Sequence, residues 1–65
     1  MFVYLSDIHG DYIYKMGRIA SVRHFVDDDN ITIFFEDKSI INFDYEDAAQ
    51  ALEAYNDLSA QLRGE

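Results

Sequence analysis

The chain contains no cysteine, no proline and no tryptophan, and only three of its 65 residues are glycine. Without cysteine it can form neither a disulfide nor a thiolate metal site. It also lacks the run of about 20 apolar residues that a membrane-spanning helix needs. The N-terminus has neither the basic start nor the long apolar segment of a secretory signal peptide, so we expect a cytoplasmic protein that does not bind membranes.

The small size limits how stable the fold can be. Hydrophobic residues make up 49% of the chain, including five Tyr and five Phe, which is too apolar for a disordered protein. We therefore expect a single domain over residues 1–65. A domain of this length buries only roughly 60% of the surface that its unfolded chain exposes. Small domains commonly gain stability from a disulfide, a metal or a second subunit, and with no cysteine present we expect a homodimer.

Basic residues are scarce. Thirteen Asp and Glu oppose five Lys and Arg, giving a formal net charge of −8. The acid is concentrated in one half, because residues 27–65 hold eleven acidic and two basic side chains, whereas residues 1–26 hold two and three. Such a chain repels nucleic acid and anionic membranes and attracts basic surfaces. Acidity also keeps small proteins soluble, and this simpler explanation stays open.

Alternating apolar residues and turn chemistry predict an antiparallel meander. The strands at residues 19–26, 31–36 and 39–43 would form this meander, and short strands are expected before it at residues 1–5 and 12–14. The intervening residues 6–11, 27–30 and 37–38 are rich in Asp, Asn, Ser and Gly, which favour loops and turns. In residues 31–36, Ile31, Ile33 and Phe35 fall on one face, as in a half-buried strand.

The last third of the chain predicts a helix. Asp44 is a suitable N-cap, and Glu46 and Asp47 would follow in the first turn, where acid complements the helix dipole. Gly64 supplies a stop. Apolar residues recur at helical spacing and form one stripe: Ala48, Ala51, Leu52, Tyr55, Leu58 and Leu62. The fold class is therefore α+β, with a three- to four-stranded antiparallel meander packed by one C-terminal helix.

One short motif resembles part of an enzyme site. The segment Ser6-Asp7-Ile8-His9-Gly10, directly after a strand, is similar to the opening Asp-x-His motif of calcineurin-like metallophosphatases. That resemblance implies that Asp7 and His9 bind metal ions that activate water. The later metal-binding segments of the family are missing, so a polar loop at a strand end is the simpler interpretation. We expect no catalysis, no bound metal and no cofactor.

The run Asp27-Asp28-Asp29-Asn30 has two interpretations as well. Oxygen-rich loops can bind calcium, but calcium loops of the EF-hand type alternate their ligands, contain a central glycine and end in a bidentate Glu. Here the acids are contiguous and no such glycine follows. A solvated hairpin turn is the simpler interpretation.

The positions of the acids suggest a binding surface. On the expected helix, Glu46, Glu53 and Asp57 lie close to one line and Asp47 flanks them. Their spacing along the axis is about 10 Å and then about 6 Å, similar in scale to the spacing of phosphates along a DNA strand. A basic surface that binds phosphates would gain similarly from such carboxylates. The turns complete the predicted set, with Asp27, Asp28 and Asp29 at one end of the sheet and Glu36 and Asp37 at the other.

Size, charge and architecture together resemble the small acidic proteins that bacteriophages use against their hosts, including DNA mimics such as the Bacillus-phage inhibitor of the nucleoid-associated protein HU. The resemblance implies a protein that occupies the basic DNA-binding surface of an HU-like partner and displaces DNA, without binding nucleic acid itself. Two alternatives stay open. One is a regulatory or assembly module that binds through a free sheet edge or through aromatic residues, namely Tyr4, Tyr12, Tyr14 and Phe34. The other is a remnant of a metallophosphatase.

Overall fold

The computed structural model describes residues 1–64 and shows five strands, a short 3-10 helix and one long α-helix. In chain order these are β1 (Phe2–Asp7), β2 (Gly10–Lys15), η1 (Met16–Arg18), β3 (Ile19–Arg23), β4 (Asn30–Phe35), β5 (Ile40–Asp44) and α1 (Ala48–Arg63). The predicted α+β class with a single C-terminal helix is confirmed.

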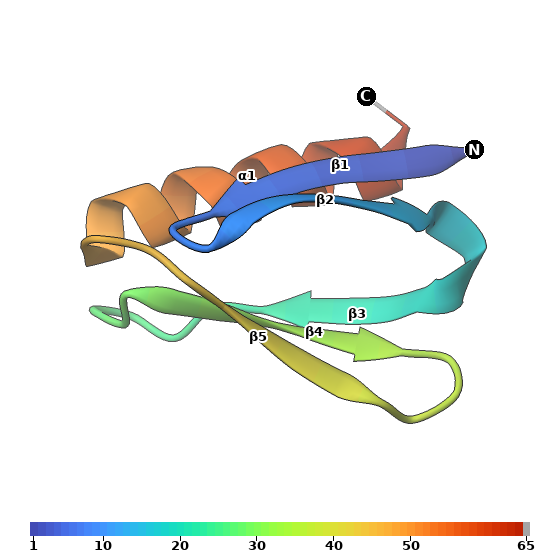
Figure 1. The fold of residues 1–65 in the computed structure, drawn as a ribbon, viewed down its shortest axis with the longest axis horizontal. Coiled ribbons are helices and arrows are strands. Elements are labelled where there is room, and N and C mark those ends of the chain that lie inside the picture. Colours follow the sequence, from blue (N-terminus) through green and yellow to red (C-terminus); the bar gives the residue numbers. More distant parts are fainter. Residues whose placement is uncertain (65) are drawn as a thin grey trace.

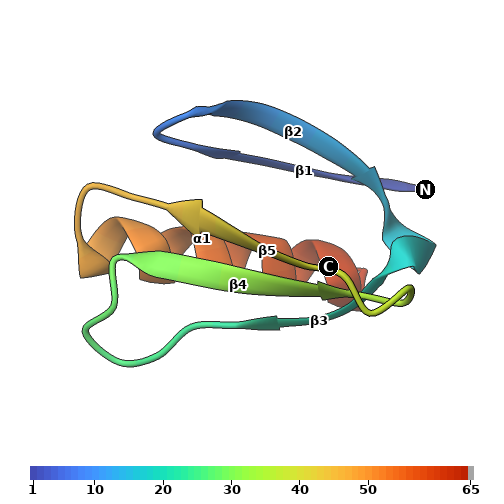
Figure 2. The ribbon, with the colours of Figure 1, turned by 60° about the horizontal axis from the view of Figure 1, so that its bottom comes forward.

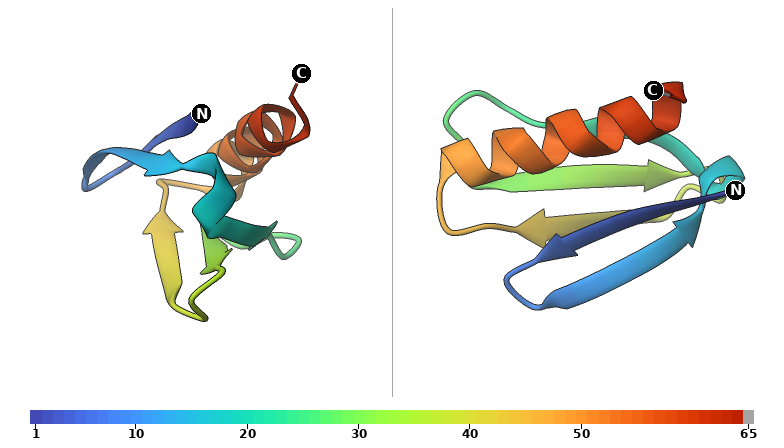
Figure 3. Two further views of the ribbon diagram at one scale, coloured as in Figure 1. Left: turned by 90° about the vertical axis from the view of Figure 1, so that its right-hand side faces the viewer. Right: turned by 90° about the horizontal axis from the view of Figure 1, so that it is seen from above.

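The strands form two antiparallel sheets. β1 and β2 make a hairpin, and β3, β4 and β5 make the predicted meander with β4 at its centre. The hairpin lies across one side of the meander, and α1 packs against β1, β3 and β4, so that it closes the opening between the two sheets (Figures 1 and 3). Burial of one face of each sheet follows from this arrangement.

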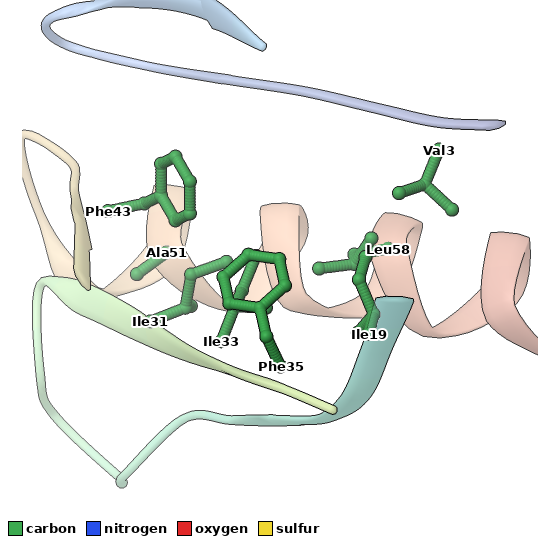
Figure 4. Packing of buried hydrophobic residues seen from close by; sticks show 8 residues of the cluster. All are labelled: Val3, Ile19, Ile31, Ile33, Phe35, Phe43, Ala51 and Leu58. Atoms are coloured by element: carbon green, nitrogen blue, oxygen red, sulfur yellow. The ribbon is translucent and has the colours of Figure 1, made fainter. Parts of the chain in front are cut away.

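The core lies where the hairpin, the meander and the helix meet. From β4, Ile31, Ile33 and Phe35 point into it, as their alternation predicts, and Phe43 of β5 lies opposite Ile31. The remaining buried apolar residues are Val3, Ile19, Ala51 and Leu58 (Figure 4). Thr32 and Phe34 point to the other face of β4, which no helix covers.

The helix begins three residues later than predicted. Its N-cap is Asp47, not Asp44, and the Asp47 carboxylate accepts a hydrogen bond of 2.8 Å from the N–H of Gln50. Asp44 is still paired with Asn30 in the meander, which holds its backbone extended. Glu46 therefore precedes the helix and does not lie in its first turn. Gly64 ends the helix in the left-handed conformation (φ 79°), as predicted.

The buried face of the helix is also rotated from the predicted stripe. Ala51 and Leu58 are fully buried, and Ala54, Tyr55 and Leu62 pack against the core, but Leu52 is 47% exposed. The rotation follows from the position of α1 beside β1. There the Gln61 side chain accepts the N–H of Tyr4 (2.9 Å) and donates to its C=O (2.8 Å), in the way that a neighbouring strand would. A polar residue thus occupies part of the contact face.

The loop predicted over residues 6–11 is wrong, because both strands continue into it. Asp7 pairs with Gly10, and only Ile8 and His9 form the turn. Conversely, β3 ends at Arg23, before the predicted end at residue 26. The chain turns there, with the N–H of Asp28 donating to the C=O of Phe25 (3.1 Å) and Asp27 in the left-handed region (φ 69°). Asp tolerates this conformation better than most residues do.

The turn between β4 and β5 contains a second left-handed residue, Lys38, with φ 72°. The N–H of Lys38 donates to the C=O of Phe35 (3.0 Å), and the N–H of Phe35 donates to the C=O of Ser39 (2.9 Å). Glycine adopts this φ without the steric cost that a Cβ brings.

We expect Lys38→Gly to raise the free energy of unfolding by about 0.5–1 kcal/mol, since relief of the strained φ outweighs the extra entropy of glycine in the unfolded chain. Lys38→Ala is the matched control, because it removes the same charge and keeps the Cβ. Urea denaturation measures both variants, and an equal gain in the two would assign the effect to charge and not to backbone conformation.

Candidate acidic interaction surface

An open groove of about 1200 Å³ runs between the hairpin and the N-terminal half of α1. Its walls include the rings of Tyr4, Tyr12 and Tyr45. Five carboxylates line it, and we call this set the acidic groove: Asp7, Asp11, Glu46, Glu53 and Asp57. Within residues 1–64 no lysine or arginine lines this groove.

The fold explains how these carboxylates meet. Asp7 and Asp11 flank the tight turn between β1 and β2, and β1 lies alongside α1. Glu53 and Asp57 are four residues apart on α1, and a separation of four places side chains on the same face of a helix, about 6 Å apart along its axis. Glu46 sits just before the helix. Of the predicted line through Glu46, Glu53 and Asp57, only the last two lie on the helix, although all three line the groove.

A second group of acids lies at the end of the molecule where α1 begins. Asp27, Asp28 and Asp29 form the loop between β3 and β4, and the C=O of Asp29 accepts the N–H of Tyr45 (2.8 Å). This bond holds the loop beside the segment that leads into Glu46 and Asp47. The turn of the hairpin reaches the same end (Figure 1). The acidic loop and the acidic groove are therefore neighbours.

Glu36 and Asp37 lie elsewhere, in the turn at the opposite end of the meander (Figure 1). The N–H of Glu36 donates to the C=O of Arg18 (2.8 Å), and Asp37 accepts hydrogen bonds from the N–H and hydroxyl of Ser39. These bonds from Ser39, helped by the Arg18 charge, lower the pKa of Asp37. This end also carries positive charge from Arg18 and Lys38. The structure thus separates these two acids from the other predicted residues.

In the part of the chain that the structure describes, no ion pair joins the carboxylates of the groove to a lysine or an arginine. Arg23 instead lies over the rings of Phe25 and Phe34, at 4.5 and 5.1 Å from their centroids. Asp44 is near the imidazole of His9 (3.3 Å), an exposed pair of low energy.

The Asp-x-His motif has a structural role. One oxygen of the Asp7 carboxylate accepts the N–H groups of His9 (2.8 Å) and Gly10 (3.2 Å), and the other accepts the N–H of Asp44 (3.1 Å). The N–H of Ile8 also donates to the C=O of Asp44 (3.1 Å). Together these bonds close the hairpin turn and attach it to the end of β5.

The same residues do not fit the two-metal centre that the phosphatase resemblance implies. Both oxygens of Asp7 already accept backbone hydrogen bonds. Among residues 1–64 there is no group of three or more His, Cys, Asp and Glu side chains that could hold a metal ion, either here or at residues 27–30. A catalytic zinc usually takes three protein ligands.

We expect Asp7→Ala to lower the free energy of unfolding by about 2 kcal/mol, because it leaves three backbone N–H groups without their acceptor. His9→Ala removes only the exposed contact with Asp44 and should cost less than about 1 kcal/mol. Chemical denaturation of the two variants measures the difference. Equal losses would argue against the carboxylate as the main attachment of the hairpin.

Tyr45 is an unusual member of the groove wall, because its hydroxyl oxygen is buried and has no hydrogen-bond partner within residues 1–64. Burial, followed by the nearby Asp7 carboxylate and Tyr12, raises its pKa to about 12. An unpartnered buried hydroxyl destabilises the fold because it has lost its bonds to water.

We expect Tyr45→Phe to raise the free energy of unfolding by about 1 kcal/mol at pH 7. The raised pKa means that the folded state holds the phenolic proton more tightly than the unfolded state does. The free energy of unfolding therefore does not change through this group below pH 10, and it falls as the pH rises from 10 towards 12. Denaturation at pH 8 and pH 11 tests this, since the wild type should lose more stability than Tyr45→Phe. A variant less stable at pH 7 would mean that the hydroxyl has a partner.

Sequence reasoning missed Asp7 and Asp11 as members of the acidic surface. They belong to the half of the chain whose net charge is slightly positive, so no charge run marks them. The available signal was the Asp7-x-x-Gly10 spacing, which is typical of a tight turn whose first Asp accepts the following N–H groups. That signal could place both acids at a hairpin end, but not beside α1.

No protein-family model, curated protein or solved structure matches the chain. Over residues 1–64, α1 is too short and too polar to cross a membrane, and no other helix qualifies.

Proposed function

We propose that this chain is a non-enzymatic binding protein that presents its acidic surface to a basic surface of another protein. The acidic surface consists of the acidic groove and the neighbouring loop with Asp27, Asp28 and Asp29. The partner class that the proposal favours is a DNA-binding protein of the HU-like kind, from which the bound chain would displace DNA. The observation that carries the proposal is the acidic groove itself, which five acidic residues line and which no lysine or arginine lines within residues 1–64.

The negative charges of the acidic surface are balanced either by cations from solution or by basic side chains of a partner. Carboxylates held close together on a rigid scaffold repel one another and gather cations from solution. A partner with lysines and arginines replaces those cations and releases them, as it does when it binds phosphates. Binding should therefore weaken steeply with salt, and DNA should compete for the same partner surface.

The scaffold supports such a role because the charged walls are regular elements. Glu53 and Asp57 stand on a capped helix, and Asp7 is fixed by three backbone hydrogen bonds. A surface that is ordered before binding loses little conformational entropy when the partner arrives. This differs from an acidic disordered tail, which must be ordered on binding.

The test is a competition assay in which the chain displaces labelled DNA from purified HU. We expect the double reversal Glu53→Lys/Asp57→Lys to weaken inhibition by about tenfold or more. The reversal Glu36→Lys/Asp37→Lys changes net charge equally at the far end and should have a much smaller effect. Equal effects of the two would show that net charge alone matters, and no inhibition by the wild type at low salt would overturn this choice of partner.

A module that binds through an apolar surface is the second candidate, favoured by the uncovered face of the meander. Phe25 and Ile40 are 55% and 58% exposed there, beside Phe34. The four aromatic residues named from the sequence do not form one surface, because Tyr12 and Tyr14 pack against Phe43 and Phe35 in the core. Binding that persists at high salt would favour this candidate.

A further inference from the structure

β2 is the outermost strand of the hairpin, and its far edge is open. Views from two directions show β1 between β2 and the helix, with no strand beyond β2 (Figures 2 and 3). β2 is paired only with β1, so the edge of β2 that faces away from β1 is the edge of this two-stranded sheet. An open edge carries unpaired N–H and C=O groups that can pair with another chain.

The hydrogen bonds of β1 show which groups of β2 face outward. Both backbone groups of Tyr4 bond to Gln61, so they point away from β2. Tyr4 lies opposite Ile13, and in an antiparallel pair such residues either exchange both bonds or neither. The N–H and C=O of Ile13 therefore point to the open edge, and by strand alternation those of Asp11 and Lys15 do too.

The other edge of the hairpin is closed in contrast. On β1, Gln61 occupies the backbone groups of Tyr4, and the N–H of Ile8 donates to the C=O of Asp44. Among the residues whose backbone groups point to this edge, only Ser6 lies between these two contacts. A new strand could add beside β2 but not beside β1.

The sequence of β2 is complementary to itself about Ile13. An antiparallel copy related by a two-fold axis at Ile13 would place Asp11 opposite Lys15 of the second copy, and Lys15 opposite its Asp11. Tyr12 and Tyr14 would likewise lie opposite each other across the axis. Opposite charges and aromatic pairs at directly facing positions are the pairs that stabilise antiparallel strands.

We propose that two copies of this chain associate through β2, forming a continuous four-stranded sheet in the order β1-β2-β2-β1. Asp11, Ile13 and Lys15 of each copy exchange their free backbone hydrogen bonds with the other. A two-stranded hairpin alone is marginally stable, and the added strands give it the width of an ordinary sheet.

The distribution of charge explains why a second copy can bind at β2 and not elsewhere on the surface. Each copy has a formal net charge of −8, so two copies repel over most of their surfaces. β2 carries one acid and one base, and Arg18 follows it. A groove of about 410 Å³ adjoins this edge, and its lining combines apolar residues such as Tyr14, Phe35 and Ile41 with the charged Lys15, Arg18 and Asp37. This is a face on which repulsion is weak and apolar surface is available.

The open side of β5 lacks the same pattern. A two-fold axis at Asn42 would set Ile40 opposite Asp44 of a second copy, an apolar side chain against a carboxylate. Asp44 is moreover already bonded to the hairpin through Asp7 and Ile8. The edge of β2 is therefore better suited than that of β5 to pair with a second copy.

Sedimentation equilibrium over a micromolar range tests the proposal. We expect the wild type to dimerise, and Asp11→Lys or Lys15→Asp to raise the dimer dissociation constant by about tenfold or more, because each sets like charges opposite each other twice. The double variant Asp11→Lys/Lys15→Asp exchanges the two charges and should restore the wild-type constant. Such a rescue cannot come from loss of folding, and circular dichroism checks each variant.

Asp27→Lys and Arg23→Asp are the controls, since they change net charge by the same amounts at the end of β3 and in the loop after it, away from β2. A wild type that stays monomeric throughout, or a dimer that neither Asp11→Lys nor Lys15→Asp weakens more than its control does, would overturn the proposal. Isotope-filtered NMR gives a direct reading of the register, with a contact expected between the Hα atoms of Tyr12 and of Tyr14 in the second copy. A dimer without that contact uses another surface.

The dimer does not depend on the proposed function. It would pair Asp11 with a lysine and leave the other four carboxylates of the acidic groove open. Failure of dimerisation would leave inhibition of DNA binding untouched, and failure of the competition assay would leave the sedimentation result untouched.

Discussion

The attachment of the hairpin by the Asp7 carboxylate is the contact on which the shape of the molecule depends. One side chain accepts the N–H groups that close the turn and the N–H of Asp44 at the end of β5. The two sheets share no strand pairing, so this contact and the Ile8 to Asp44 bond fix how they sit together at that end. At the other end Gln61 holds β1 against the helix.

Both surfaces of interest follow from that placement. With β1 held beside α1, Asp7 and Asp11 of the hairpin line the same acidic groove as Glu53 and Asp57 of the helix. With β1 in the inner position, β2 is left as the outer strand, and its edge has no partner in the described part of the chain. The polar attachments through Asp7 and Gln61 therefore together set the position of the charged face and of the open edge.

Periodicity was enough to predict the meander and the helix. Ile31, Ile33 and Phe35 alternate as buried strand residues do, and the apolar spacing from Ala51 to Leu62 is helical. The helix start was wrong because Asp44 and Asp47 are both suitable N-caps, and only the pairing of Asp44 with Asn30 decides between them. Local sequence does not contain that information.

The candidate site was predicted only on its helical wall. The spacing of Glu53 and Asp57 is local and could be deduced, whereas the approach of Asp7 and Asp11 depends on hydrogen bonds between residues 37 positions apart. The motif around Asp7 resembles a metal-binding sequence, but in the structure its carboxylate closes a turn. Asp-rich turns and metal-binding loops share residue types, and only the hydrogen bonds distinguish them.

The acidic residues fall into two groups, those whose side chains accept backbone hydrogen bonds and those whose side chains do not. Asp7, Asp37 and Asp47 accept backbone N–H groups and so stabilise a turn or a helix start. Within residues 1–64, the side chains of Glu46, Glu53 and Asp11 make no such bond. Fold stability gives no reason to place these three together, because mutual repulsion there opposes folding. The proposed binding role would account for their position along one groove, since a cationic partner there would be attracted to all three.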